Sequence, residues 1–178
     1  MNVTIVGTGY VGLVTGCCLA SVGNKVTCVD NNQAKVKDMT AGKVPIFEPG
    51  LEDLMKSGVA DGNLTFTDNL DQGASEADVI FLALPTPPKD DGSADLSAVL
   101  SVAEQLGSVL PAKYCVIIDK STVPVGTAEA VRAEIAKNAT SEFDVVSNPE
   151  FLREGFAVKD FLEPERVVVG VTSENAEK

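Results

Sequence analysis

The sequence predicts an α/β protein with a doubly wound parallel sheet, in three layers with helices on both sides of the strands. Short apolar segments alternate with stretches of helical spacing along the whole chain. Residues 78–84 (DVIFLAL) are almost wholly apolar, as in a central parallel strand that is covered on both faces. With 178 residues, 44% of them apolar, the chain is long enough for one such domain with a sizeable core.

The first thirty residues contain the clearest pattern. Residues 1–6 read as a strand, a glycine turn (GTGYVG) follows at residues 7–12, and residues 11–22 have helical spacing. Residues 25–30 form a second strand that ends in Asp30. This order of strand, glycine turn, helix, strand and acid is typical of a dinucleotide-binding unit of the Rossmann type.

Each glycine of the turn has an expected task. Gly7 allows the sharp turn, Gly9 keeps a side chain out of the path of a pyrophosphate, and Gly12 lets the helix lie close to the strand. The helix then begins at Tyr10 and Val11, where unpaired N–H groups and the helix dipole favour an anion. We therefore expect these five residues to contact the cofactor.

The first helix is expected to bury one stripe. Val11, Val14, Cys18 and Val22 recur at the spacing of one helical face. Gly16 lies inside the same helix, where a glycine costs roughly 1 kcal/mol relative to alanine, and this indicates close backbone packing on one side.

Asp30 is expected to select the cofactor. A carboxylate at this position accepts hydrogen bonds from the ribose hydroxyls of the adenosine half and repels a 2′-phosphate. The chain continues with Asn31 and Asn32 instead of the arginine that NADP sites usually place nearby. NAD is therefore favoured over NADP. Lys35, one turn into the next helix, is placed to reach the same ribose, although a lone surface lysine is usually only solvated.

The remaining elements follow in alternation. Further strands are expected at residues 64–67, 78–84, 114–119, 143–147 and 166–171. Further helices are expected at residues 33–39, 51–58, 68–77, 95–106, 127–137 and from 173 onward. Asp68, Asp95 and Thr127 read as helix caps, and Gly58 reads as the stop of its helix.

Three polar segments follow three successive strands, and ligands of open parallel sheets bind at that edge. They are residues 85–88 (PTPP), 121–124 (STVP) and 148–154 (NPEFLRE). Thr86 and Thr122 offer hydroxyls, and a helical turn would bring Glu150 and Glu154 to one side. Two acids near a nicotinamide could bind sugar hydroxyls or hold a water. Each segment also has a plain reading as a turn, and the two acids as a solvated loop paired with Arg153.

Composition excludes several classes of function. A net charge of −12 disfavours nucleic acid and anionic membrane surfaces as partners. The absence of histidine removes histidine bases, Ser-His-Asp triads and most zinc sites, so no metal is expected. No apolar run approaches the ~20 residues of a membrane span, and no signal peptide is apparent. The expectation is a cytoplasmic enzyme whose four cysteines are buried thiols.

Several motifs together resemble one family. They are GTGYVGLVTG, PIFEPGLEDLM, PTPP followed by DGSADLSAV, KSTVPVGT, and NPEFLREGFAVKDFLEPERVVVG. In this order they resemble the UDP-glucose 6-dehydrogenases among the nucleotide-sugar dehydrogenases, from residue 1 to about residue 171. KSTVPVGT and NPEFLREG discriminate better than the glycine turn does.

The resemblance implies oxidation of the C6 alcohol of UDP-glucose to UDP-glucuronate with reduction of two NAD, through a cysteine thioester. It also assigns roles to matching positions. Val11, Asp30, Lys35, Thr86, Ser121, Thr122 and Glu154 would contact NAD. Glu150, Phe151, Leu152, Arg153 and Glu154 would line the sugar-nucleotide site. Thr122 and one glutamate, with Glu150 favoured over Glu154, would position the water that carries the proton.

The family pattern extends beyond this chain. Its nucleophilic cysteine lies in a glycine-rich stretch downstream, and its central dimer helix and its uridine-binding domain are also missing here. We therefore expect residues 1–178 to be an NAD-binding domain of a truncated protein that is inactive alone, with the full-length protein a homodimer or a higher oligomer. Three alternatives stay open: a dehydrogenase of GDP-mannose or UDP-N-acetylmannosamine, a non-catalytic NAD-binding regulatory module, and an interaction domain with a degenerate glycine loop.

Overall fold

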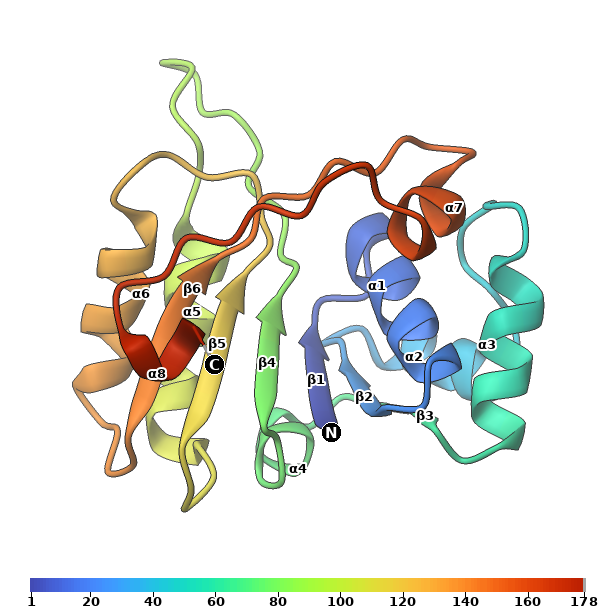
Figure 1. Ribbon diagram of the computed structural model, residues 1–178, viewed down its shortest axis with the longest axis horizontal. Coiled ribbons are helices and arrows are strands. Elements are labelled where there is room, and N and C mark those ends of the chain that lie inside the picture. Colours follow the sequence, from blue (N-terminus) through green and yellow to red (C-terminus); the bar gives the residue numbers. More distant parts are fainter. Residues whose placement is uncertain (178) are drawn as a thin grey trace.

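The computed structural model describes residues 1–177 as a parallel sheet between two layers of helices (Figure 1). The strands are β1 Asn2–Val6, β2 Lys25–Val29, β3 Leu64–Thr67, β4 Val79–Leu82, β5 Cys115–Asp119 and β6 Phe143–Ser147. The helices are α1 Tyr10–Ser21, α2 Gln33–Thr40, α3 Leu51–Ala60, α4 Leu70–Ala74, α5 Ser97–Val109, α6 Thr127–Ala136, α7 Ala157–Leu162 and α8 Glu174–Glu177. The predicted fold class is confirmed.

The strand order creates the edge at which a ligand can bind. The six strands run parallel in the order β3-β2-β1-β4-β5-β6. The chain first winds outward from β1 to β3, then crosses back to β4 on the other side of β1 and winds outward again. In the register, Val6 lies opposite both Val29 and Leu82, so these strands end at one level. The crossovers diverge between β1 and β4, and a crevice opens there at the carboxyl ends.

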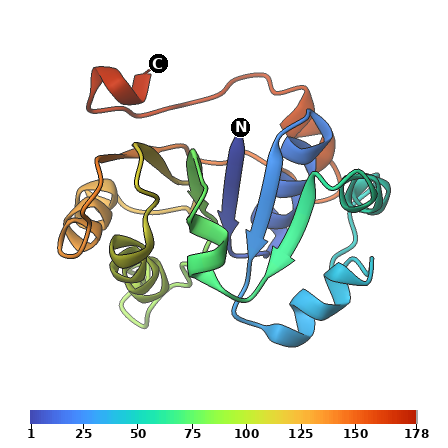
Figure 2. The same cartoon turned by 90° about the horizontal axis from the view of Figure 1, so that it is seen from below.

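Helices cover both faces of the sheet (Figure 2). Two hydrophobic clusters lie between the sheet and these helices. The first joins α1, α3 and α7 to β1–β3 through fully buried side chains such as Leu13, Leu51 and Met55. The second joins α4, α5 and α6 to β4–β6 through side chains such as Leu106, Ile117 and Ile135. Among the helices of residues 1–177, none combines the length and apolar character that a bilayer crossing requires.

Helix α1 is buried nearly all round, so the expected single stripe was too narrow. Val14 and Cys18 are fully buried, but so are Leu13 and Cys17, while Val22 is 64% exposed beyond the end of the helix. The reason is that α3 and α7 cover the side of α1 that faces away from the sheet. The close packing expected at Gly16 is confirmed, because a Cβ there would lie 2.6 Å from the Cys28 sulfur.

Four helix ends differ from the predictions. Helix α5 begins at Ser97 with Leu96 as its N-cap, not Asp95. Helix α3 runs through Gly58 to Ala60, and Gly58 instead serves close packing, since its Cβ would lie 3.0 Å from that of Leu64. Asn69, not Asp68, caps α4, which ends at Ala74. The N-cap of α6 is Gly126, because the hydroxyl of Thr127 donates to the carbonyl of Pro124.

Two predictions near the C-terminus were wrong as well. Residues 166–171 form no strand; only Gly170 pairs with Ser147, in an isolated antiparallel bridge. Val167 and Val169 are 67% and 54% exposed. Valine favours strands, which led to the prediction, but this stretch has no partner strand along its length. Helix α7 was not predicted, because its six residues are too few to show a helical period.

Candidate cofactor and substrate site

The turn between β1 and α1 is shaped to receive a pyrophosphate. Gly7 has φ +96°, and a Cβ there would lie 2.4 Å from the carbonyl oxygen of Ala83. A Cβ on Gly12 would lie 1.9 Å from the carbonyl oxygen of Gly7, so only glycine allows α1 this close to the strand. Gly9, by contrast, has no protein atom within 4 Å of such a Cβ. Its missing side chain leaves space beside the start of α1.

The start of α1 is also electrostatically prepared for an anion. No side chain caps its N-terminus, and its first turn contains no acidic residue. Its free N–H groups and the positive end of the helix dipole therefore remain available to a ligand. The space at Gly9 and this uncapped helix end both fit a dinucleotide pyrophosphate.

Asp30 lies at the end of β2 within a dense hydrogen-bond network. Its carboxylate accepts from the backbone N–H of Thr8 at 3.1 Å, from the Thr8 hydroxyl, from the N–H of Asn32 at 3.0 Å and from the Lys35 ammonium at 2.9 Å. Burial raises the pKa of Asp30, but these donors outweigh it and hold the pKa below its ordinary value. Asp30 is thus ionised at neutral pH, as discrimination against a 2′-phosphate requires.

A cavity of about 760 Å³ runs along the carboxyl ends of the strands from Asp30 to the far side of β5. Its lining contains most of the residues predicted to bind the cofactor: Gly7, Gly9, Tyr10, Val11, Asp30, Lys35, Thr86, Ser121 and Thr122. Gly12 lies beneath the turn, where it is buried. The cavity is therefore elongated, as an extended dinucleotide requires, with the ribose-selective acid at one end.

The other end of this cavity is formed by the loops after β4 and β5. The hydroxyl of Thr86 donates to the carbonyl of Thr122 at 2.9 Å. The hydroxyl of Ser121 donates to the carbonyl of Leu84 at 3.0 Å and accepts from its N–H at 3.2 Å. These bonds hold the two loops together, so the rim at this end is ordered before any ligand arrives.

A second cavity, of about 540 Å³, lies beside the first. The predicted substrate residues Glu150, Phe151, Leu152 and Arg153 line it, together with Phe161 of α7 and residues 163–167. Only two residues line both cavities, Lys120 and Glu150. The two cavities therefore meet at a wall that carries one ammonium and one carboxylate.

Glu150 and Glu154 do not share a helical turn. The Glu150 carboxylate accepts the N–H of Leu152 at 2.7 Å and faces the cavities. Glu154 is exposed and lines neither cavity. Arg153 pairs with neither glutamate, since its guanidinium binds Asp160 at 2.6 Å and lowers the pKa of Asp160 to about 2. The interpretation of Arg153 as the ion partner of these acids is wrong.

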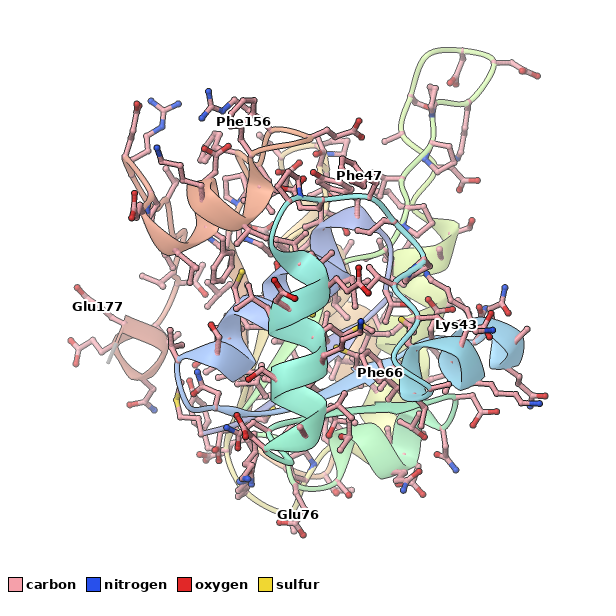
Figure 3. All side chains as sticks on the ribbon, turned by 90° about the vertical axis from the view of Figure 1, so that its right-hand side faces the viewer. Lys43, Phe47, Phe66, Glu76, Phe156 and Glu177 are labelled. Atoms are coloured by element: carbon pink, nitrogen blue, oxygen red, sulfur yellow. The ribbon has the colours of Figure 1, made fainter. Side chains whose placement is uncertain are left out.

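Glu48 joins three distant segments beside the site. Its carboxylate, 5% exposed, accepts from the hydroxyl of Tyr10, from the N–H of Gly155 at 2.7 Å and from the N–H of Val158 at 3.3 Å. Burial raises the pKa of Glu48, but these donors outweigh burial and lower it overall. In Figure 3, Phe47 lies in the loop above α3 and Phe156 lies at the start of α7, and both side chains are exposed.

Sequence reasoning missed Lys120, Asn148 and Glu48. Lys120 directly precedes the polar segment 121–124, and Asn148 begins the segment 148–154; the rule that ligands bind beyond strand ends applies to both. Glu48 lies in a loop 38 residues from Tyr10, and no local pattern predicts their contact.

The chain is similar to known proteins in sequence and in fold. Residues 1–178 match the UDP-glucose/GDP-mannose dehydrogenase family, NAD binding domain. The chain belongs to this family. It is 47% identical over 175 residues to the UDP-glucose 6-dehydrogenase of Pseudomonas aeruginosa, covering 96% of this chain and 38% of that protein.

Solved structures of the family have the same fold. A ternary complex of GDP-mannose dehydrogenase from Pseudomonas aeruginosa superposes with a TM-score of 0.95 at 34% identity, covering 99% of this chain and 42% of that one. UDP-glucose dehydrogenase from Pyrobaculum islandicum gives 0.95 at 38% identity, covering 98% and 41%. This chain is thus an NAD-binding domain of a dehydrogenase family, and it spans about two-fifths of its relatives' length.

The cysteines of the domain lie away from both cavities. Cys17, Cys18, Cys28 and Cys115 are fully buried, as predicted, and none lines either cavity. Burial raises the pKa of Cys115 to about 12, so its sulfur is a thiol at neutral pH. A thiol in this state and position is no nucleophile for a ligand in the cavities.

Proposed function

We propose that this chain is the NAD-binding part of a UDP-glucose 6-dehydrogenase, which oxidises the C6 alcohol of UDP-glucose to the carboxylate of UDP-glucuronate with two NAD. The carrying observation is the second cavity, lined by residues 150–153, which meets the NAD cavity at a charged wall. A module that only binds NAD needs the glycine turn and Asp30, but it has no use for this cavity. The full-length protein is proposed to add a nucleophilic cysteine, a dimer helix and a uridine-binding domain.

The residues have distinct tasks in this proposal. The N–H groups at the start of α1 hold the pyrophosphate, and Asp30 with Lys35 holds the adenosine ribose. Thr86, Ser121 and Thr122 lie toward the nicotinamide half, because the adenosine half occupies the β2 side of the crevice. NAD, when bound, supplies the hydride acceptor. Glu150 and Thr122 hold the water that takes the alcohol proton. Glu154 remains a proposed NAD contact, and its exposure would require the loop to move.

GDP-mannose is the second candidate substrate, because the structure is similar to that of a GDP-mannose dehydrogenase. The GDP-mannose dehydrogenase of Pseudomonas aeruginosa shares the fold at the same TM-score as the UDP-glucose enzyme of Pyrobaculum islandicum. We rank UDP-glucose first, because the curated relatives at 47% identity are UDP-glucose 6-dehydrogenases.

Thermal unfolding of the chain with NAD and with NADP tests the cofactor assignment. A ligand at 100 times its Kd adds roughly 2.7 kcal/mol, so NAD should raise the melting temperature clearly and NADP should not. Asp30→Asn should weaken NAD binding roughly tenfold or more, because a charged hydrogen-bond acceptor is lost, and should narrow the preference over NADP.

Asp38→Asn is the matched control. Asp38 lies on α2, outside both cavities, and forms a surface ion pair with Lys43. If NAD does not raise the melting temperature of the wild-type chain, the proposal is contradicted and an interaction domain with a degenerate glycine loop is favoured.

A further inference from the structure

Lys120 is the one cation in the wall between the two cavities. It directly follows β5, and its side chain is almost entirely buried, with the residue 6% exposed. Its ammonium donates to the amide oxygen of Asn148 at 3.1 Å and lies 5.9 Å from the centre of the Phe161 ring. No carboxylate lies within ion-pair distance of it among residues 1–177.

Burying the Lys120 ammonium without a paired anion costs folding free energy. Burial lowers the pKa of Lys120, and the negative charge of Glu150 opposes that shift. An ammonium has three N–H donors, and the structure gives Lys120 one hydrogen bond, to a neutral amide. A buried cation with donors to spare and no paired anion among residues 1–177 favours an anion that these residues do not supply.

The position of Lys120 between the two cavities indicates which negatively charged group it would contact. Asp30 and the start of α1 place the adenosine and pyrophosphate toward β2, so the nicotinamide reaches the β5 end of the crevice. The second cavity opens at the same point. Among the described residues, Lys120 and Glu150 line both cavities, so a cofactor in the first cavity and a substrate in the second would meet beside them.

We propose that Lys120 is a further catalytic residue, whose ammonium donates a hydrogen bond to the reacting oxygen of the substrate alcohol. This inference rests on the proposed function. In the step, the substrate C–H bond breaks and its hydride reduces NAD⁺ to NADH, while the O–H proton passes to the water held by Glu150. A C=O bond forms, and the ammonium stabilises the negative charge that develops on the oxygen.

The binding test uses the 178-residue chain with its lysines labelled with ¹³C at Cε, and Lys120→Arg to assign the signal. NAD should shift the signals of Lys35 and Lys120, whereas AMP, which lacks the nicotinamide half, should shift only Lys35. Lys113 is the control, because it pairs with Asp78 at the opposite end of the same strands. If NAD shifts Lys35 and leaves Lys120 unchanged, the inference is wrong and the cofactor site stands. If NAD shifts neither, the proposed function fails.

The activity test uses the full-length protein that the proposed function implies, with Lys120→Ala and Lys120→Met. Loss of an electrostatic donor should lower kcat roughly 10²- to 10³-fold, with the Kd for NAD changed less than about threefold. Ethylammonium should restore part of the kcat of Lys120→Ala, since it supplies the missing donor to the space left behind. Lys113→Ala should keep its activity.

Three results would overturn the role of Lys120. They are a Lys120→Ala enzyme with near wild-type kcat, a loss of kcat that ethylammonium does not relieve, and a loss that is explained by a weaker Kd for NAD. An inactive wild-type enzyme would count against the proposed function instead.

Discussion

At the scale of single residues, the domain tolerates two poorly compensated buried charges close together in the sequence. Lys120 faces the cavities, and Asp119 faces the α5–α6 side of the sheet, as Ile117 does. Asp119 is 2% exposed, and one of its oxygens has no hydrogen-bond partner among the described residues. Burial raises its pKa to about 6, although the N–H of Ser121 opposes the shift.

This pKa gives stability a defined pH dependence. The folded pKa lies above the ordinary value of 3.8, so the contribution of Asp119 to stability is full below about pH 3.8 and is lost as pH rises through about 6. Asp119→Asn, which mimics the protonated acid, should raise the free energy of unfolding at pH 7 by about 2–3 kcal/mol. Urea unfolding at pH 4 and pH 7 measures this. A variant equally stabilised at both values would show that charge is not the cause.

At the scale of residues, sequence reasoning succeeded where the local geometry allows only one or two residue types. Gly7, Gly12 and Asp30 stand as predicted, because a left-handed turn, a close approach and a strand-end acid leave few choices of residue. It failed for Glu48, whose three donors come from distant parts of the chain.

At the scale of elements, the glycine turn and α1 separate folding from binding. A Cβ at residue 12 would overlap the backbone of Gly7, whereas a Cβ at residue 9 meets no protein atom, at an ordinary φ of −63°. Gly12→Ala should lower the free energy of unfolding by roughly 1–3 kcal/mol or more, the usual cost of overpacking, because the backbone of Gly7 would have to move.

Gly9→Ala should keep the wild-type melting temperature and still lose NAD binding, because its methyl group enters the space meant for the pyrophosphate. Calorimetry with and without NAD separates the two effects. Equal NAD affinity in Gly9→Ala and wild type would mean that the pyrophosphate lies elsewhere.

Element boundaries show where sequence patterns stop being informative. The core strands β1 to β6 were predicted within about two residues, since apolar runs between turns are distinctive. Residues 166–171 are apolar in the same way, yet of these residues only Gly170 pairs, with Ser147 of the edge strand β6. Helix α7 depends on Glu48, which accepts from its first turn, so it exists through tertiary contact.

At the scale of the whole molecule, Glu48 fastens the glycine-turn helix, the loop before α3 and the substrate-lining segment together. Glu48→Ala would remove the acceptor of the Tyr10 hydroxyl and of the half-buried N–H of Val158, at about 1–3 kcal/mol each. The half-buried N–H of Gly155 would keep only the Tyr10 hydroxyl as its acceptor. We expect a clear loss of stability and faster amide exchange around Gly155 and Val158. Phe47→Ala is the control, since Phe47 is 89% exposed. Unchanged exchange at Gly155 would show that the clamp is not needed.

The chain alone should bind NAD without turnover. All four cysteines are buried away from the cavities, so residues 1–177 offer no cysteine nucleophile to a bound substrate. With UDP-glucose and NAD, the purified chain should form no NADH by absorbance, while its melting temperature rises with NAD. Sustained NADH formation, free of contaminating enzyme, would refute this.

The long cavity reaches over the ends of several strands and draws Asp30 from the end of β2 and Thr122 from the loop after β5. The sheet below it is continuous, since β1 and β4 pair directly, while the two hydrophobic clusters lie on its two faces. A dinucleotide that touches both ends of the cavity would connect the elements around the two clusters a second time, across the carboxyl ends of the strands. Its binding should therefore make the two clusters unfold more cooperatively than they do in the ligand-free protein.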